Sequence, residues 1–93
     1  YYSGMKTTII DTREPYEYAL SHVDGAINIP PQGFMMDTLP PELIELPRDD
    51  EIILYCRSGM RSNTVGHILR QHGFTNIVNG VNENHVAKLI GER

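Results

Sequence analysis

The sequence predicts an α/β protein whose mainly parallel central sheet, of about four or five strands, carries helices on both faces. Short apolar segments rich in β-branched residues alternate along the chain with segments whose apolar residues recur at helical spacing. The connections between these segments are short, as they are between successive strand–helix units of a parallel sheet. Because 93 residues have the size of one domain, we expect a single domain over residues 1–93.

The first predicted unit is a strand followed by a short helix. Residues 7–10, Thr-Thr-Ile-Ile, are β-branched throughout and lead into a polar Asp-Thr-Arg sequence, which indicates a buried strand. Pro15 suits the first turn of a helix, and residues 16–20 predict that helix. We expect Asp11 or Thr12 to cap it.

The middle of the chain is the least regular part. A predicted turn at residues 22–25 leads into a short strand at 26–29. The prolines that follow predict a short helix or turn near Met35, Met36 and Leu39, a short helix at 41–46 and a polar turn at 48–50.

The C-terminal half predicts two further units: a strand at 51–55 with a helix at 62–72, then a strand at 76–79 with a helix at 82–90. The unbroken apolar centre of the first of these strands predicts a central position, covered on both faces. We expect Gly73 to stop the longer helix and Gly80 to form a turn after the last strand.

Composition and charge exclude several classes of function. The net charge of −4 and the absence of a run of Lys or Arg argue against a nucleic-acid partner. No apolar stretch approaches the roughly 20 residues needed to span a membrane. A single cysteine excludes an internal disulfide and a cysteine-rich metal site. Because no signal peptide is visible, we expect a cytoplasmic protein.

That cysteine, Cys56, follows the most apolar predicted strand and opens a loop that leads into a helix. Backbone N–H groups, a helix N-terminus and guanidinium groups all lower the pKa of a thiol, so the pattern predicts a thiolate nucleophile. We expect the charges of Arg57 and Arg61 to contribute more than the helix dipole. The expected anion-binding residues are those of the loop: Arg57, Ser58, Gly59, Met60, Arg61 and Ser62.

The segment around the loop is cationic. No Asp or Glu lies between Glu51 and Glu83, whereas Arg57, Arg61 and Arg70 do. We therefore expect a small anionic substrate.

A second set of polar residues is expected at the same edge of the sheet. Active sites of open α/β sheets lie at the carboxyl ends of strands, so Asp11 and Arg13 should share one rim with Cys56. We expect a structural ion network in which Asp11 or Glu17 holds Arg13. His22 is expected to hydrogen-bond within its turn.

Two stretches of the chain resemble the signatures of single-domain rhodaneses, which are thiosulfate sulfurtransferase-like proteins. Residues 10–30 are similar to the family's pattern D-x-R…E-[YF]…G-H-I-x-G-A-x-N-I-P, with Ser21 in place of the usual glycine. Residues 56–62, Cys-Arg-Ser-Gly-Met-Arg-Ser, are similar to its active-site loop C-x-x-G-x-R-S. The order and spacing of the two stretches also match, and together they cover most of the chain.

The resemblance implies a rhodanese-like fold and a ping-pong sulfur transfer without metal or organic cofactor. The Cys56 thiolate attacks the outer sulfur of an anionic donor such as thiosulfate and becomes a persulfide. A thiophilic acceptor, such as cyanide or a thiol, then removes that sulfur. A sulfur-accepting protein is a further acceptor that the resemblance allows.

Two departures from the family pattern motivate an alternative. The family usually opens with a further strand and helix, where only residues 1–6 precede the first strand here, so we expect a shortened N-terminal part. Near the C-terminus, Asn79-Gly80-Val81 stands where the family often shows Gly-Gly and an aromatic-rich helix. The alternative function is a non-catalytic or partner-dependent module that carries sulfur or docks to another protein.

A less favoured alternative is a cysteine-dependent phosphatase or arsenate reductase. Those enzymes use a loop one residue longer than the six residues from Cys56 to Arg61. They also generally have a histidine before the cysteine, where this chain has Tyr55. The shorter loop favours binding of a single sulfur atom over binding of a tetrahedral phosphoryl group.

Overall fold

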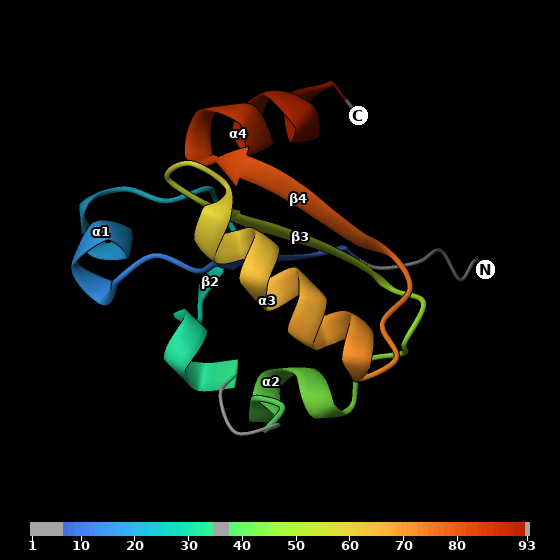
Figure 1. The fold of residues 1–93 in the computed structure, drawn as a ribbon. Helices are drawn as coiled ribbons and strands as arrows, with labels where there is room; N and C mark the ends of the chain where they lie inside the picture. The colour runs from blue at the N-terminus through green and yellow to red at the C-terminus, as the bar shows by residue number, and fades with distance from the viewer. Residues whose placement is uncertain (1–6, 35–37, 93) are drawn as a thin grey trace.

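A computed structural model of the chain describes residues 7–34 and 38–92 and has a four-stranded sheet with the order β2-β1-β3-β4 (Figure 1). Every strand pair is parallel. The strands are β1 (Thr7–Asp11), β2 (Ile27–Asn28), β3 (Glu51–Cys56) and β4 (Ile77–Asn82). The prediction of an α/β protein with a parallel sheet is therefore confirmed.

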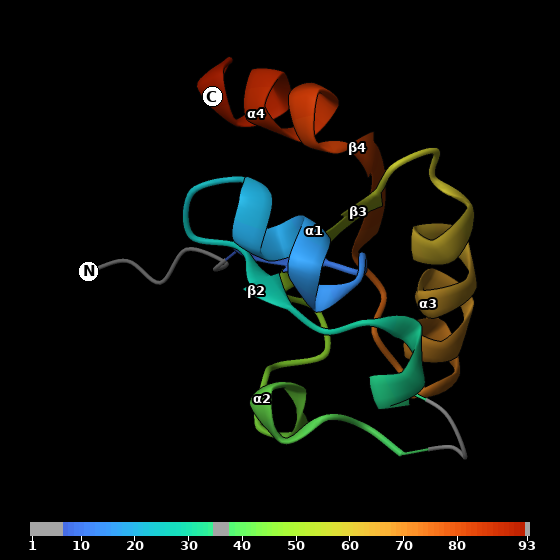
Figure 2. The ribbon, with the colours of Figure 1, turned by 90° about the vertical axis from the view of Figure 1, so that its left-hand side faces the viewer.

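Helices cover both faces of this sheet, as predicted (Figure 2). One face packs against the elements η1 (Pro31–Phe34), α2 (Pro41–Ile44) and α3 (Met60–Gln71). The other face packs against α1 (Pro15–Leu20) and α4 (Glu83–Gly91). Within the described ranges, no helix is long and apolar enough to cross a membrane.

Strand β3 lies between β1 and β4. This central position, covered on both faces, explains why its sequence is apolar without alternation. Ile52 and Leu54 belong to the core on the α3 face, whereas Ile53 and Tyr55 belong to the core on the α1 and α4 face. All four side chains are fully buried. Burying an apolar side chain of this size contributes about 1.5–3 kcal/mol, so β3 is a major source of stability.

Helix α1 is capped by a residue that the sequence analysis did not choose. Glu14 is the N-cap, and its N–H donates to Glu17 Oε1 at 2.9 Å, which completes a capping box. The expectation of a cap at Asp11 or Thr12 is wrong because both residues continue the contacts of β1. Thr12, for example, donates its N–H to the carbonyl of Tyr55 at 2.9 Å.

Several helix boundaries also differ from the prediction. Helix α3 begins at Met60, two residues before the predicted start, because Gly59 adopts a φ of +92° and turns the chain directly into it. It ends at Gln71, and Gly73 follows with a φ of +94°, as expected for a helix stop. Helix α2 is shorter than predicted, and the expectation around Met35 and Met36 lies outside the described residues.

The predicted turn at Gly80 is wrong, because Gly80 lies inside β4 as the extra residue of a β-bulge. Leu54 pairs with Asn79, but the next residue of β3, Tyr55, pairs with Val81. A methyl group on Gly80 would collide with the side chain of Val86 on α4, so no larger residue fits. The bulge leaves Val81 with a φ of +72°, which is unusual for a β-branched residue.

Candidate functional site

The thiol of Cys56 lies at the carboxyl edge of the sheet, at the end of β3. The residue is 2% exposed, and the N–H of Gly59 donates to Sγ at 3.1 Å. Ser62 Oγ, in the first turn of α3, lies 3.7 Å from the same sulfur. The chain from Cys56 to Ser62 therefore wraps around one sulfur atom, and the positive φ of Gly59 makes this tight path possible.

Hydrogen bonds control the ionisation of this thiol. Burial raises the pKa of Cys56, but hydrogen bonds from the backbone and hydroxyl of Ser62 and from the backbone of Ser58 and Gly59 lower it, to about 7 from an ordinary 9.0. A substantial fraction of the thiol is therefore ionised near neutral pH. The principal lowering causes are these hydrogen bonds, whereas the sequence analysis compared only the arginine charges with the helix dipole.

Asn79 holds Ser62 in place from the neighbouring strand. Ser62 Oγ lies 2.7 Å from Asn79 Oδ1, and Asn79 Nδ2 donates to the carbonyl of Gly59 at 3.0 Å. The Val81 N–H also donates to Asn79 Oδ1, at 3.0 Å. One amide side chain on β4 thus fixes both the loop and the hydroxyl nearest to the sulfur.

The two arginines of the loop lie in different environments. Arg61 Nη1 donates to Glu17 Oε1 at 3.0 Å, and this bond lowers the pKa of the Glu17 carboxyl. Arg57 forms a longer ion pair with Glu17, at 3.9 Å, and its side chain is 76% exposed. Arg61 is therefore anchored to α1, whereas Arg57 is available at the surface.

The predicted ion network around Arg13 exists, with Asp11 as its central carboxylate. Asp11 accepts hydrogen bonds from Arg13 Nη2 at 2.8 Å and from the Tyr55 hydroxyl at 3.0 Å, and it is fully buried. Burial raises the pKa of Tyr55 to about 12, so the phenol remains a donor. Glu17, the other carboxylate proposed as a direct partner of Arg13, pairs with Arg61 and Arg57 instead.

His22 contacts the helix before it. Its Nδ1 lies 2.8 Å from the carbonyl oxygen of Tyr18, and the two rings stack with centroids 3.7 Å apart. This arrangement agrees with the structural role that the sequence suggested. The described residues contain no group of three or more His, Cys, Asp or Glu able to hold a metal ion.

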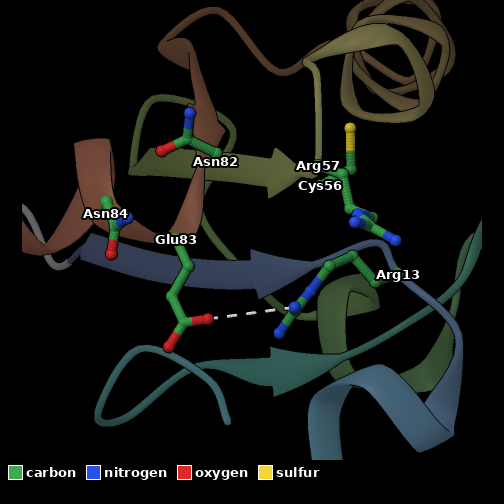
Figure 3. A pocket seen from close by; sticks show the side chains of 6 residues that line it. All are labelled: Arg13, Cys56, Arg57, Asn82, Glu83 and Asn84. Atoms are coloured by element: carbon green, nitrogen blue, oxygen red, sulfur yellow. Dashed lines mark ion pairs between the residues drawn. The ribbon is translucent and has the colours of Figure 1, made fainter.

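A hollow of about 180 Å³ opens beside the cysteine (Figure 3). It is lined by Arg13, Cys56, Arg57, Asn82, Glu83 and Asn84. Figure 3 shows Cys56 Sγ directed toward the loop before α3, and the Glu83 carboxylate directed toward Arg13. Glu83 Oε1 lies 3.8 Å from Arg13 Nη1 and accepts a hydrogen bond from Ser21 Oγ at 2.9 Å.

The cationic character expected from the sequence is absent at this edge. Three carboxylates face three guanidinium groups: Asp11, Glu17 and Glu83 against Arg13, Arg57 and Arg61. Their formal charges cancel before the thiol ionises. The absence of acidic residues between Glu51 and Glu83 did not predict this balance, because Glu17 on α1 and Glu83 on α4 pair with the arginines of this edge.

The sequence analysis missed Asn79 and Glu83 as residues of the site. For Glu83 a signal existed, because it directly follows the carboxyl end of β4, the kind of position that pointed to Asp11. For Asn79 no signal existed, because its approach to Ser62 depends on where β4 bulges.

The sequence model of the rhodanese-like domain family matches residues 2–82 of the chain. The chain belongs to this family. A solved structure described as a rhodanese with anions from E. coli has a TM-score of 0.68 and 28% identity, over 87% of this chain and 92% of that one. This rhodanese-like domain therefore shares both the sequence pattern and the fold of the family.

Curated relatives of the chain include sulfurtransferases. A thiosulfate:glutathione sulfurtransferase from Saccharomyces cerevisiae is 37% identical over 76 residues, which is 73% of this chain and 55% of that protein. A sulfurtransferase from Allochromatium vinosum is 32% identical over 71 residues, which is 76% of this chain and 62% of that protein. The chain thus spans somewhat more than half the length of these relatives.

Proposed function

We propose that this rhodanese-like domain is a sulfurtransferase that moves a sulfane sulfur through a persulfide on Cys56. The observation that carries the proposal is the sulfur itself, enclosed by the loop with the Gly59 N–H at 3.1 Å. Backbone donors of this kind stabilise negative charge on a thiolate, and equally on the terminal sulfur of a persulfide. The sulfurtransferase relatives support the same reaction type.

In the first half-reaction, the Cys56 thiolate attacks the outer sulfur of the donor, for which we take thiosulfate. A new S–S bond forms to Cys56, the S–S bond of thiosulfate breaks, and sulfite leaves with its electron pair. The products are a Cys56 persulfide anion and sulfite, so the total charge of −3 is unchanged. No oxidant or cofactor enters the balance.

In the second half-reaction, a thiophilic acceptor such as cyanide or a thiolate attacks the terminal sulfur. The bond between that sulfur and Cys56 Sγ breaks, and its electron pair returns to Cys56 as the thiolate. Positioning of the two sulfur atoms is the domain's main contribution to this transfer.

The loop residues take different roles in this proposal. Arg57 binds the sulfonate end of the donor, because its guanidinium is exposed beside the hollow and forms only a long ion pair. Arg61 fixes the entrance of α3 through Glu17. Ser58, Gly59 and Ser62 supply hydrogen bonds to the sulfur, and Met60, which is 75% exposed, forms an apolar part of the rim.

Persulfide formation tests the proposal directly. After incubation with thiosulfate, intact-protein mass spectrometry should show the addition of one sulfur atom, and Cys56→Ser should show none. The Cys56→Ser variant keeps nearly the same side-chain volume and should fold, and a thermal melt checks that it does. An unmodified wild-type protein, under conditions that load another sulfurtransferase, would contradict the proposal.

A second candidate is a partner-dependent sulfur carrier, as the sequence alternative suggested. Its support is a group of exposed apolar side chains around Arg57: Tyr16 (66% exposed), Leu20 (82%) and Met60 (75%). Tyr16, Leu20 and Arg57 line one surface hollow together. Exposed apolar groups beside a reactive residue are typical of protein contacts.

Turnover in isolation distinguishes the two candidates. A free-standing enzyme transfers sulfur from thiosulfate to cyanide without further components. A carrier reaches comparable turnover only after cell extract is added. Turnover by the purified chain that extract leaves unchanged would contradict the carrier.

A further inference from the structure

Glu83 brings a carboxylate to the hollow beside Cys56. Its Oε1 accepts from Ser21 Oγ at 2.9 Å and lies 3.8 Å from Arg13 Nη1. The Arg13 Nη2 is held more closely by Asp11 at 2.8 Å and by the Ser21 carbonyl at 2.6 Å. The charge of Arg13 is therefore already neutralised by a buried carboxylate, and Glu83 keeps much of its negative charge for a ligand.

Two hollows meet at this residue. The hollow of about 180 Å³ beside Cys56 and a second, of about 380 Å³, are both lined by Glu83 and Asn84. The second lies between the turn after α1 and helix α4, and its other lining residues are His22, Val23, Asp24, Ala87, Ile90 and Gly91. A molecule whose sulfur reaches Cys56 and whose remainder lies in the second hollow must pass Glu83.

The charge of the second hollow is negative. Of the described residues that line the second hollow, none is Lys or Arg, whereas Glu83 and Asp24 are acidic. After sulfur loading, the terminal sulfur of Cys56 adds another negative charge. The Glu83 side is thus complementary to a cation, and the opposite side of the first hollow, where Arg57 lies, is complementary to an anion.

We propose that Glu83 selects sulfur acceptors that are small thiols carrying a protonated amine. This inference rests on the proposed function and adds the class of acceptor. The acceptor sulfur attacks the terminal sulfur of the Cys56 persulfide anion while the thiol proton of the acceptor moves to that terminal sulfur; the new S–S bond forms on the acceptor, and the electron pair of the broken bond returns to Cys56 as thiolate. The ammonium group lies against the Glu83 carboxylate throughout.

A pair of thiol reagents tests the selection without relying on sulfur transfer. The probes are 2-aminoethyl and 2-hydroxyethyl methanethiosulfonate, which differ by the ammonium group. The Cys56 thiolate forms an S–S bond with either reagent, and methanesulfinate leaves with the electron pair. We expect Glu83→Gln to lower the ratio of the two rate constants about 5-fold, the effect of one partly exposed charge pair.

Matched variants complete this experiment. Glu42→Gln removes a carboxylate on the exposed surface of α2, remote from the hollows, and should leave the ratio unchanged. Asn84→Asp adds a carboxylate to both hollows and should raise the ratio about 2-fold. An unchanged ratio in folded Glu83→Gln overturns the proposal; if that variant does not fold, an unchanged ratio in Asn84→Asp overturns it.

The persulfide form gives the second readout. Cysteamine and 2-mercaptoethanol should discharge the loaded wild-type protein at rates whose ratio also falls about 5-fold in Glu83→Gln. Equal ratios in the two proteins would overturn the proposed role of Glu83. If Cys56 cannot be loaded at all, the proposed function fails, and the methanethiosulfonate ratio still decides whether Glu83 attracts an amine.

Discussion

Two groups of charged residues lie at the carboxyl edge of the sheet, and they differ in burial and in hydrogen bonding. The group of Asp11, Arg13 and Tyr55 is buried, and Asp11 alone accepts bonds from Arg13 Nη2 at 2.8 Å and Tyr55 at 3.0 Å. The group at the mouth, Arg57 and Glu83, is partly or largely exposed; its ion pairs are longer, at 3.9 and 3.8 Å, and Glu83 also accepts a hydrogen bond from Ser21 Oγ at 2.9 Å.

This difference assigns the two groups different roles: the buried group stabilises the edge of the sheet, and the exposed group can bind a ligand. A buried ion pair is costly to break, because removal of one partner leaves an uncompensated charge away from water. Exposed pairs of this length contribute little to stability, so their side chains can change partners when a substrate arrives. The side chain of Cys56 is buried, yet it lines the open hollow together with Arg13 from the first group and with both members of the second.

The largest effect should come from breaking the buried group. Asp11→Ala leaves the Arg13 guanidinium without its main partner, and we expect the free energy of unfolding to fall by about 3–5 kcal/mol. Urea unfolding followed by circular dichroism measures this change. Asp49→Ala, at an exposed turn position, is the control and should change stability by less than about 0.5 kcal/mol. Equal stability of the two variants would contradict the comparison.

An intermediate effect is expected at the hydroxyl beside the sulfur. Ser62→Ala removes a hydrogen bond that lowers the pKa of Cys56, so that pKa should rise from about 7 by roughly one unit, which is about 1.4 kcal/mol. The thiolate absorbance near 240 nm, followed against pH, reports the midpoint, with Cys56→Ser as the blank.

The same titration fixes the direction of the pH dependence. Because the folded-state pKa of Cys56 lies below the ordinary value of 9.0, persulfide formation by the wild type should increase as the pH rises through 7. Thr64→Ala, which changes a hydroxyl of α3 that donates to the Met60 carbonyl, should leave the midpoint in place. A wild-type midpoint near 9 would contradict the hydrogen-bonding account.

The smallest effect is expected at the mouth. Arg57→Gln should leave the free energy of unfolding unchanged within about 0.5 kcal/mol, but should raise the KM for thiosulfate about 5-fold. Arg61→Gln is the matched control. It removes the 3.0 Å ion pair of Glu17, a residue that is only 8% exposed, and should lower the free energy of unfolding by about 1–3 kcal/mol. Loss of stability in Arg57→Gln with an unchanged KM would reverse the assignment of the two arginines.

The sequence predicted the layered fold well, because its main signals are local. The apolar run of β3, the periodicity of α3 and the glycine after it depend on neighbouring residues alone. The position of Cys56 at the end of β3 followed from the same pattern. The association of Asp11 with Arg13 was also predictable, because the two side chains are two residues apart at the end of one strand.

The electrostatics of the site could not be predicted in the same way. Glu17 reaches Arg61 across 44 positions of sequence, so the acid-free interval around the loop gave no sign of it. The control of the thiol by Ser62 and its partner Asn79 depends on distances that only the packed chain determines. Charges counted along the chain thus predicted a cationic edge where the packed chain has balanced charges, whereas apolar periodicity predicted the right layers.

The bulge at Gly80 makes the length of β4 a determinant of the pocket. Side chains on a strand point alternately to its two faces, and the extra residue shifts that alternation for everything after it. If the chain kept Gly80 but paired with β3 without the bulge, Val81 rather than Asn82 would lie opposite Cys56, and Asn82 would move to the opposite face of the sheet. The bulge therefore decides which side chain of β4 forms a wall of the hollow beside Cys56, although it changes no residue of the loop from Cys56 to Ser62.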